Sequence, residues 1–218
     1  MQEVPLFPLN AVLFPGMPIS LHIFEPRYKL MINQCIENEQ PFGIVLIEEG
    51  EEVLGPLATP HAVGCMARIT QVERLEDGRM NILAVGQERF QVQTLNHDRP
   101  YLIGEVEPLP LNEQDTPLAQ NAARQLRPLV ERYLSVLSSV SQPFDFTPGS
   151  LPDDPLALAY LAATIVQIPV EQKQPLLGVD DAVELLADMR TIYLREVALL
   201  RAMIERDPRE NAAAFSRN

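Results

Sequence analysis

The side chains that most often bind metal ions, histidine and cysteine, are few and widely spaced in this sequence. They are His22, Cys35, His61, Cys65 and His97. Zinc sites usually draw their ligands from close pairs such as Cys-x-x-Cys, and none of these spacings matches such a pattern. We therefore expect no metal site and no other cofactor, and we interpret both cysteines as free, buried thiols.

Nucleophilic and phosphate-binding chemistry also lacks a recognisable sequence pattern. No G-x-x-x-x-G-K-[ST] phosphate loop occurs, and the only lysines, Lys29 and Lys173, lie in no dyad-like context. A serine nucleophile needs a base within hydrogen-bonding reach, and no serine has an evident one. The sequence therefore predicts no catalytic residues, and we expect a protein that is not an enzyme.

Two charged motifs have a ligand-binding and a structural interpretation. The segment 48–52 holds four glutamates around one glycine, but it lacks the alternating ligand spacing of a calcium loop, which favours a solvated loop. Glu25 and Arg27 could face a ligand. We favour a structural ion pair or a hydrogen bond to the main chain.

The charge balance bears on the class of partner. The formal net charge is −13, and residues 1–110 and 111–218 contribute −8 and −5. Phosphate backbones and anionic membrane surfaces attract basic proteins, so the balance disfavours nucleic acid and membranes as partners. The N-terminus has no basic, then apolar, signal-peptide pattern, and with only two cysteines we expect a cytoplasmic protein.

The first half of the chain reads as β-rich with one helix. Alternating or continuous apolar runs of strand length predict several strands. The expected strands are 4–7, 18–24, 42–47, 63–75, 80–85, 89–95 and 101–106, with a helix from Pro26 to about Glu37. Such a set predicts a small closed sheet filled by side chains. The residues expected inside are Ile19, Leu21, Val45, Ile69, Ile82 and Val92.

Two turns in this half should need glycine. Phe14-Pro15-Gly16 predicts a tight turn with Phe14 in the core, and Asp77-Gly78 predicts a hairpin turn. We expect positive φ, or a similarly restricted backbone, at both glycines.

The second half reads as helical. Apolar residues recur at helical spacing after Thr116-Pro117, after Asp154-Pro155 and after Asp180 or Asp181. Between them we expect a Pro-rich loop over 141–152 and a short turn from Val170 that Pro175 stops. The change of pattern near residues 108–116 predicts two domains, a β-rich one over 1–110 and a helical one over 111–218.

Several motifs in order resemble the N-terminal substrate-binding domain of Lon proteases. They are Val4-Pro5-Leu6-Phe7-Pro8-Leu9, Val12-Leu13-Phe14-Pro15-Gly16, Ile23-Phe24-Glu25-Pro26-Arg27-Tyr28, Val63-Gly64, Asp77-Gly78, Val85-Gly86-Gln87-Glu88-Arg89-Phe90, Asp154-Pro155 and Pro169-Val170-Glu171-Gln172-Lys173-Gln174. The resemblance covers nearly the whole chain. It implies an α+β fold, in which a PUA-like β pseudo-barrel with one helix precedes a C-terminal helical bundle.

The resemblance also implies a function. It suggests a non-catalytic module that binds unfolded polypeptide segments or a protein partner. The chain ends where the ATPase and peptidase modules of a complete Lon protease would begin, so we expect a free-standing domain. The alternative is an RNA-binding protein, because PUA-like folds include RNA binders, and the acidic balance of both halves argues against it.

The expected binding site lies outside the closed sheet. A groove between the two halves or an exposed sheet edge could accept a peptide. The candidate binding residues are Phe24, Arg27 and Tyr28, since aromatic residues and arginine dominate interface energetics and these three follow a strand.

Overall fold

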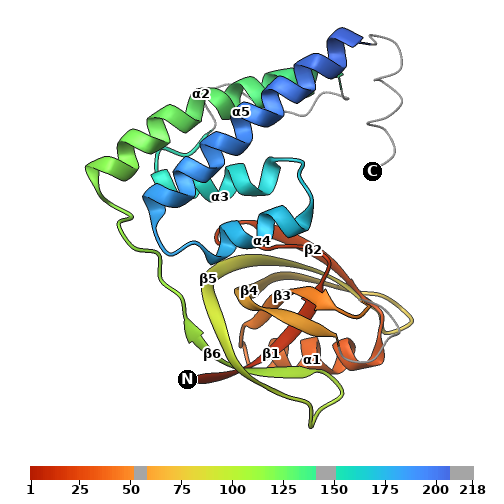
Figure 1. Ribbon diagram of the computed structural model, residues 1–218. Helices are drawn as coiled ribbons and strands as arrows, with labels where there is room; N and C mark the ends of the chain where they lie inside the picture. The colour runs from red at the N-terminus through yellow and green to blue at the C-terminus, as the bar shows by residue number, and fades with distance from the viewer. Residues whose placement is uncertain (52–57, 141–150, 207–218) are drawn as a thin grey trace. The chain divides into compact units, whose positions relative to one another are not determined.

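The structure is a computed structural model that describes residues 1–51, 58–140 and 151–206. Its elements, in chain order, are β1 (Gln2–Leu9), β2 (Pro18–Ile23), α1 (Pro26–Glu37), β3 (Phe42–Glu49), β4 (Thr59–Arg74), β5 (Met80–Asn96), β6 (Leu102–Pro108), α2 (Pro117–Val140), α3 (Pro155–Ile165), α4 (Val170–Gly178) and α5 (Ala182–Arg206) (Figure 1). The α+β class expected from the sequence is confirmed, with a six-stranded sheet and five helices in the described residues.

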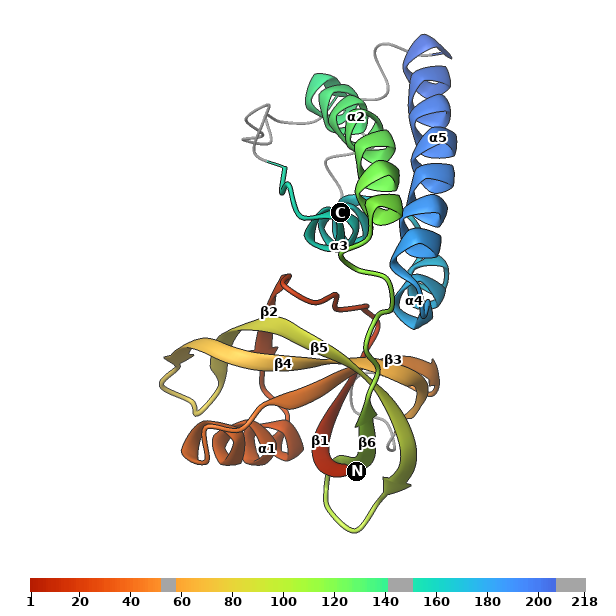
Figure 2. The ribbon, with the colours of Figure 1, turned by 90° about the vertical axis from the view of Figure 1, so that its left-hand side faces the viewer.

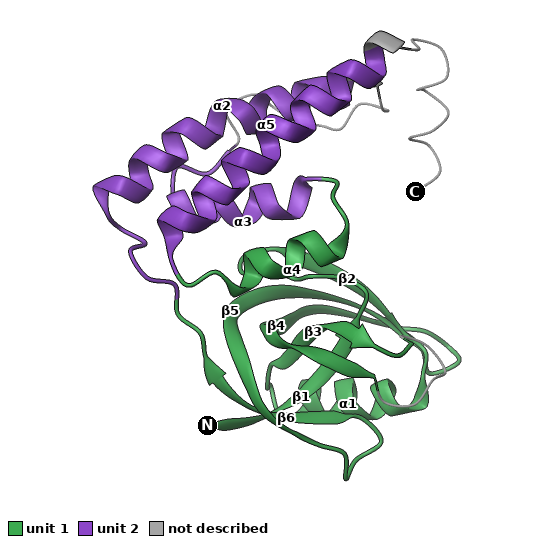
Figure 3. Ribbon diagram, viewed as in Figure 1, with its two compact units in different colours: residues 1–110, 167–180 green, residues 111–166, 181–218 purple. Residues whose placement is uncertain are grey.

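The contacts divide the chain into two compact units, which are described separately (Figure 3). Unit 1 comprises residues 1–110 and 167–180, and unit 2 comprises 111–166 and 181–218. The division into domains over 1–110 and 111–218 stays a prediction. The compact units differ from it in one segment, 167–180, which contains α4 and groups with the strands.

The sheet of unit 1 has the strand order β2-β5-β4-β3-β1-β6, and β5 also pairs with β6. Following these pairings from β5 through β4, β3, β1 and β6 leads back to β5, so five strands form a closed ring. Strand β2 pairs with β5 alone and lies outside that ring. Figure 2 shows β5 curving from its pairing with β4 toward β6. Strand β5 pairs with β4 along one edge and with β2 and then β6 along the other, and its registers with β4 and β6 each contain an irregularity of the kind that bends a strand.

Unit 1 holds two clusters of buried apolar side chains rather than one filled interior. The larger lies between α1 and the sheet and includes Tyr28, Met31, Ile32 and Cys35 of the helix. The smaller includes Val4, Leu6, Val45, Met66, Phe90, Leu102 and Val106.

The prediction that these residues fill one closed interior is therefore wrong in part. Of the six residues expected there, Val45 and Val92 belong to the smaller cluster, whereas Ile19, Leu21, Ile69 and Ile82 pack into the larger one. Alternation within a strand tells which residues share a face. It does not tell which of two cores that face contacts.

The two glycine turns are confirmed. Gly16 has φ of 77° and Gly78 has φ of 73°. In the first turn, the Met17 N–H donates to the Phe14 carbonyl at 3.1 Å, which is the hydrogen bond of a four-residue turn with glycine third. Phe14 itself is fully buried, as expected.

Two predicted boundaries are wrong. The strands expected at 80–85 and 89–95 are one continuous strand, β5, because the intervening residues keep pairing with β4. Helix α4 does not stop before Pro175 but runs through it to Gly178. A proline removes one backbone donor, and a short helix tolerates that loss where the surrounding packing holds it.

Unit 2 consists of α2, α3 and α5. Tyr133 of α2 and Tyr193 of α5 meet edge to face, with ring centroids 5.1 Å apart, and the Tyr193 hydroxyl donates to the Ala162 carbonyl of α3 at 3.0 Å. The caps follow the sequence: Asp154 accepts from the Ala157 N–H, and Asp181, one of the two candidates, accepts from the Val183 N–H.

Part of the Pro-rich loop expected over 141–152, residues 141–150, lies outside the described residues. Within the part of the chain that the structure describes, no helix combines the length and apolar character needed to cross a membrane.

Candidate functional site

The three candidate binding residues lie where β2 ends and α1 begins. Pro26 occupies the first turn of α1, where its missing N–H costs no helical hydrogen bond, and Glu25 stands at the N-cap position. The Glu25 side chain makes no capping bond. It is instead paired with Arg27, whose Nη2 lies 3.0 Å from the Glu25 Oε2. Of the two structural interpretations that the sequence favoured, an ion pair or a hydrogen bond to the main chain, the ion pair is confirmed.

Tyr28 is a core residue with 4% of its surface exposed. Its ring stacks on Phe7 of β1, with centroids 4.1 Å apart and planes 17° from parallel. The Arg27 guanidinium lies over the Tyr28 ring, 4.7 Å from the ring centre. Arg27 and Tyr28 therefore join the β1 core to the start of α1, and neither presents a large surface to solvent.

Phe24 differs from its two neighbours because 41% of its surface is exposed. A large aromatic side chain with this exposure stands out beside the buried residues Ile23, Glu25 and Tyr28 of the same junction. Its ring stacks against His22 of β2, with ring centroids 5.9 Å apart and planes 24° from parallel. Phe24 and His22 thus form a partly exposed aromatic pair at the end of β2.

A shallow groove with a volume of about 270 Å³ lies beside this pair, and we name it the β2 groove. The residues that line it are Phe7, Leu9, Ser20, Leu21, His22, Ile23, Phe24, Glu25 and Tyr28. Its walls are mainly apolar, and all of its lining residues belong to unit 1. The groove has room for one large side chain rather than for a small-molecule ligand of drug size.

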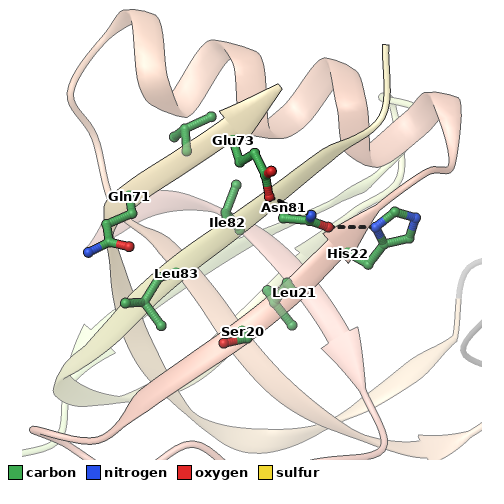
Figure 4. Close-up of a pocket in the computed structure, with 9 residues that line it drawn as sticks. Ser20, Leu21, His22, Gln71, Glu73, Asn81, Ile82 and Leu83 are labelled. Carbon is green, nitrogen blue, oxygen red and sulfur yellow. Dashed lines mark hydrogen bonds between the residues drawn. The ribbon is translucent and has the colours of Figure 1, made fainter. Parts of the chain in front are cut away.

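A row of polar side chains crosses three strands next to the β2 groove (Figure 4). Asn81 of β5 lies opposite both Glu73 of β4 and His22 of β2 in the sheet register. The Asn81 Nδ2 donates to the Glu73 Oε2 at 2.8 Å, and the Asn81 Oδ1 lies 2.7 Å from the His22 Nδ1.

The chemistry of this row determines the state of His22. A carboxylate only accepts, so Asn81 must present its NH₂ group to Glu73 and its oxygen to His22. The His22 Nδ1 therefore carries a proton and donates. In a neutral ring, Nε2 is then an acceptor at the surface.

The cysteines do not provide reactive thiolates. Cys35 and Cys65 are free and buried, as expected. Burial raises the pKa of the Cys35 thiol to about 11 and that of Cys65 to about 12. Both thiols are therefore protonated near neutral pH, and a thiol in that state is a poor nucleophile and metal ligand. In the described residues, no group of three or more His, Cys, Asp or Glu side chains is arranged to hold a metal ion.

Sequence reasoning missed the residues around the three candidates. It considered His22 only as a possible metal ligand, which the spacings excluded, and it passed over Asn81. Only part of the signal was present in the sequence, because a two-residue Asp77-Gly78 hairpin brings these strands together but would pair Glu73 with Ile82. In the structure Leu75 bonds to Arg79, so three residues form the turn and Glu73 lies opposite Asn81. Nothing in the sequence indicated that β2 would join the far side of β5 and complete the row.

Comparisons with known proteins find similarity to Lon proteases over most of the chain. The sequence model described as the ATP-dependent protease La (LON) substrate-binding domain matches residues 3–192. A Lon protease of Anaeromyxobacter dehalogenans is 26% identical over 197 residues, which cover 87% of this chain and 22% of that protein. Lon protease 2 of Myxococcus xanthus is 26% identical over 199 residues, or 88% of this chain and 23% of its own length. The chain thus spans about a fifth of the length of these relatives.

Solved structures show the same similarity in three dimensions. A Lon N-terminal domain protein from Xanthomonas campestris aligns with a TM-score of 0.66 and 26% identity, covering 87% of this chain and 97% of that one. The N-terminal domain of Lon protease from the Mycobacterium avium complex aligns with a TM-score of 0.64 and 20% identity, covering 88% and 98%, and supports the fold alone.

Proposed function

The chain belongs to the Lon substrate-binding domain family, and from that premise we propose that it is a non-catalytic module that binds unfolded polypeptide segments or a protein partner. The observation that carries the proposal is the family match over residues 3–192, nearly the whole chain. The match is to the substrate-binding part of Lon and not to its peptidase part, which supports binding rather than catalysis.

The proposal extends to the finer architecture and to the cell compartment. We infer that the closed ring of β1, β3, β4, β5 and β6 is a PUA-like pseudo-barrel and that α2, α3 and α5 form a helical bundle. The pairing between β5 and β6 supports the first inference, and the contact of Tyr133 with Tyr193 supports the second. Free, buried cysteines favour a reducing compartment, so we propose a cytoplasmic location.

The proposed binding residues are Phe24, Arg27 and Tyr28, and their surroundings suggest different roles. Phe24 offers an exposed ring for direct contact with an apolar side chain of the bound segment. Arg27 and Tyr28 would act indirectly, since their mutual contact and the stacking of Tyr28 on Phe7 hold the start of α1 beside the β2 groove.

A binding experiment with an unfolded protein tests the proposal. Fluorescently labelled casein would be titrated with the pure chain, and anisotropy would report binding, while gel electrophoresis would follow cleavage with and without ATP. We expect saturable binding without cleavage. Absence of binding would overturn the proposed module, and cleavage that co-purifies with the chain through several columns would overturn its non-catalytic character.

A further inference from the structure

We infer that the free edge of β2 binds an extended polypeptide segment by β-strand addition, with the apolar face of that segment lying over the β2 groove and one large side chain entering it. This inference rests on the proposed function and specifies the mode of binding. The strand order ends at β2, so in the part of the chain that the structure describes no strand pairs with its outer side.

The register of β2 shows which main-chain groups face that outer side. In an antiparallel pair, opposite residues alternate between exchanging hydrogen bonds and not doing so. The Gly86 N–H donates to the Met17 carbonyl at 2.9 Å, just before the pairing of Pro18 with Val85. Alternation from this point makes the pairs of Ile19, Leu21 and Ile23 the hydrogen-bonded ones.

The N–H and C=O groups of Ser20 and His22 must then point away from β5. A second contact agrees with this phase, because the Leu83 carbonyl, opposite Ser20, accepts from Thr70 of β4 and so faces the other neighbour. Both Ser20 and His22 are exposed. The edge therefore offers two sets of main-chain donors and acceptors in the geometry that an added strand requires.

The β2 groove defines the side chains of the occupant. Leu21 and Ile23 of β2, together with Phe7, Leu9 and Tyr28, provide an apolar floor beside this edge. An added strand directs alternate side chains to opposite faces, so one set would rest on this floor and the other would face solvent. The site thus suits a segment of about six residues in which every second side chain is apolar.

The overall charge indicates whether the β2 edge binds a segment of another protein or a second copy of this chain. The formal net charge of −13 opposes the approach of another copy and favours a segment that is neutral or basic on its solvent-facing side. We therefore assign the edge to a partner polypeptide with alternating apolar and neutral or basic residues.

The test compares two peptides of the same sequence and charge. One is a labelled peptide of about twelve residues that alternates phenylalanine or valine with lysine, and the other has its six central amide nitrogens methylated. Strand addition needs these amides, so we expect the methylated peptide to bind the full chain at least about tenfold more weakly at physiological salt. Equal affinity for the two peptides would overturn strand addition whatever the behaviour of any variant.

Variants of the edge locate the site. Ser20→Pro and His22→Pro each remove an outward N–H without removing a main-chain bond to β5, and we expect each to weaken binding by about tenfold. His22→Pro also removes the side-chain bond to Asn81, so Ser20→Pro is the cleaner of the two variants. Ser20→Ala keeps the N–H and should weaken binding less than Ser20→Pro. Circular dichroism and melting would verify the fold, and amide hydrogen exchange of Ser20 and His22 in the unsubstituted chain should slow when the peptide binds.

The outcomes separate this inference from the proposed function. Suppose that the unsubstituted chain and both proline variants bind casein equally and that exchange at Ser20 and His22 is unchanged. This result would refute strand addition at β2 and leave the proposed binding function in place. If the chain does not bind casein, both strand addition at β2 and the proposed binding function are refuted. Sedimentation velocity that shows a dimer dissociated by Ser20→Pro would assign the edge to a second copy and overturn the partner peptide.

Discussion

The guanidinium of Arg89 donates a hydrogen bond of 2.7 Å to the main-chain carbonyl of Leu177, which lies 88 residues further along the chain. The same nitrogen also donates to the carbonyl of Val179. Arg89 belongs to β5 and has only 3% of its surface exposed, and both carbonyls lie at the end of α4. A second bond, from the Gln174 Nε2 to the Val63 carbonyl of β4 at 2.9 Å, fixes the same helix on the sheet.

Substitution of Arg89 should therefore destabilise unit 1. Arg89→Met removes the donor to two carbonyls at the end of α4, and we expect a loss of about 2–4 kcal/mol in the free energy of unfolding. Denaturant unfolding measures this loss, and hydrogen exchange should show faster exchange in 170–178. A matched exposed variant, Arg68→Met, should change stability by less than about 0.5 kcal/mol. Equal effects of the two variants would contradict the role of the Arg89 contact.

Alanine at Gly16 and at Gly86 should destabilise the protein for different reasons. At Gly16 an added Cβ meets no atom within 4 Å, but its φ of 77° strains any residue with a side chain, at about 1–2 kcal/mol. At Gly86 a Cβ would lie 2.3 Å from the Phe14 carbonyl oxygen, so the backbone must move and the loss should be larger.

Asparagine distinguishes the two mechanisms, because it tolerates positive φ better than alanine. Gly16→Asn should recover part of the stability lost in Gly16→Ala, whereas Gly86→Asn should be at least as unstable as Gly86→Ala. Thermal unfolding of the four variants measures this order. Recovery by asparagine at Gly86 alone would show that the two sites have been interpreted the wrong way round.

Phe24 and Tyr28 should separate binding from stability. Phe24→Ala removes an exposed ring, so we expect unfolding to change by at most about 1 kcal/mol while casein binding weakens several-fold. Tyr28→Ala removes a buried ring stacked on Phe7 and should cost about 3–5 kcal/mol.

Melting temperature and anisotropy are measured together on both proteins. Leu118→Ala, which truncates a side chain with 63% exposure in unit 2, serves as the control for loss of exposed apolar surface. Full binding by a folded Phe24→Ala protein would remove Phe24 from the site.

The buried thiols predict a loss of stability at alkaline pH. The folded pKa values of about 11 for Cys35 and about 12 for Cys65 lie above the ordinary 9.0, so folding favours the protonated thiols. Their contribution is fully present below pH 9 and is lost as the pH rises from about 9 toward 12, because the unfolded chain releases these protons first.

The Cys35→Ala, Cys65→Ala double variant should accordingly lose less stability between pH 9 and 10.5 than the unsubstituted chain does. Denaturant midpoints across this range measure the difference. As an independent measurement, the native thiols should react slowly with a disulfide reagent at pH 8, because they are buried and protonated. Parallel curves for the two proteins would show that the thiols do not contribute.

The sequence alone determined those features that depend on neighbouring residues. The positive φ of Gly16 and Gly78 and the cap at Asp154 all arise within a few positions of one another, where chain geometry leaves few choices. The sequence narrows the cap of α5 to Asp180 or Asp181, and the structure shows Asp181. The α+β class followed from apolar periodicity, which records whether a segment buries one face of a helix or of a strand.

The tertiary structure alone decided how distant segments combine. The closure of β5 onto β6, the addition of β2 to the far side of β5, and the anchoring of α4 by Arg89 join residues that local pattern treats as unrelated. The polar row from Glu73 to His22 and the exposure of Phe24 beside a buried Tyr28 depend on that assembly. The physical reason is that a strand's pattern fixes which side chains share a face, whereas the partner of each face and edge is chosen by packing across the whole sheet.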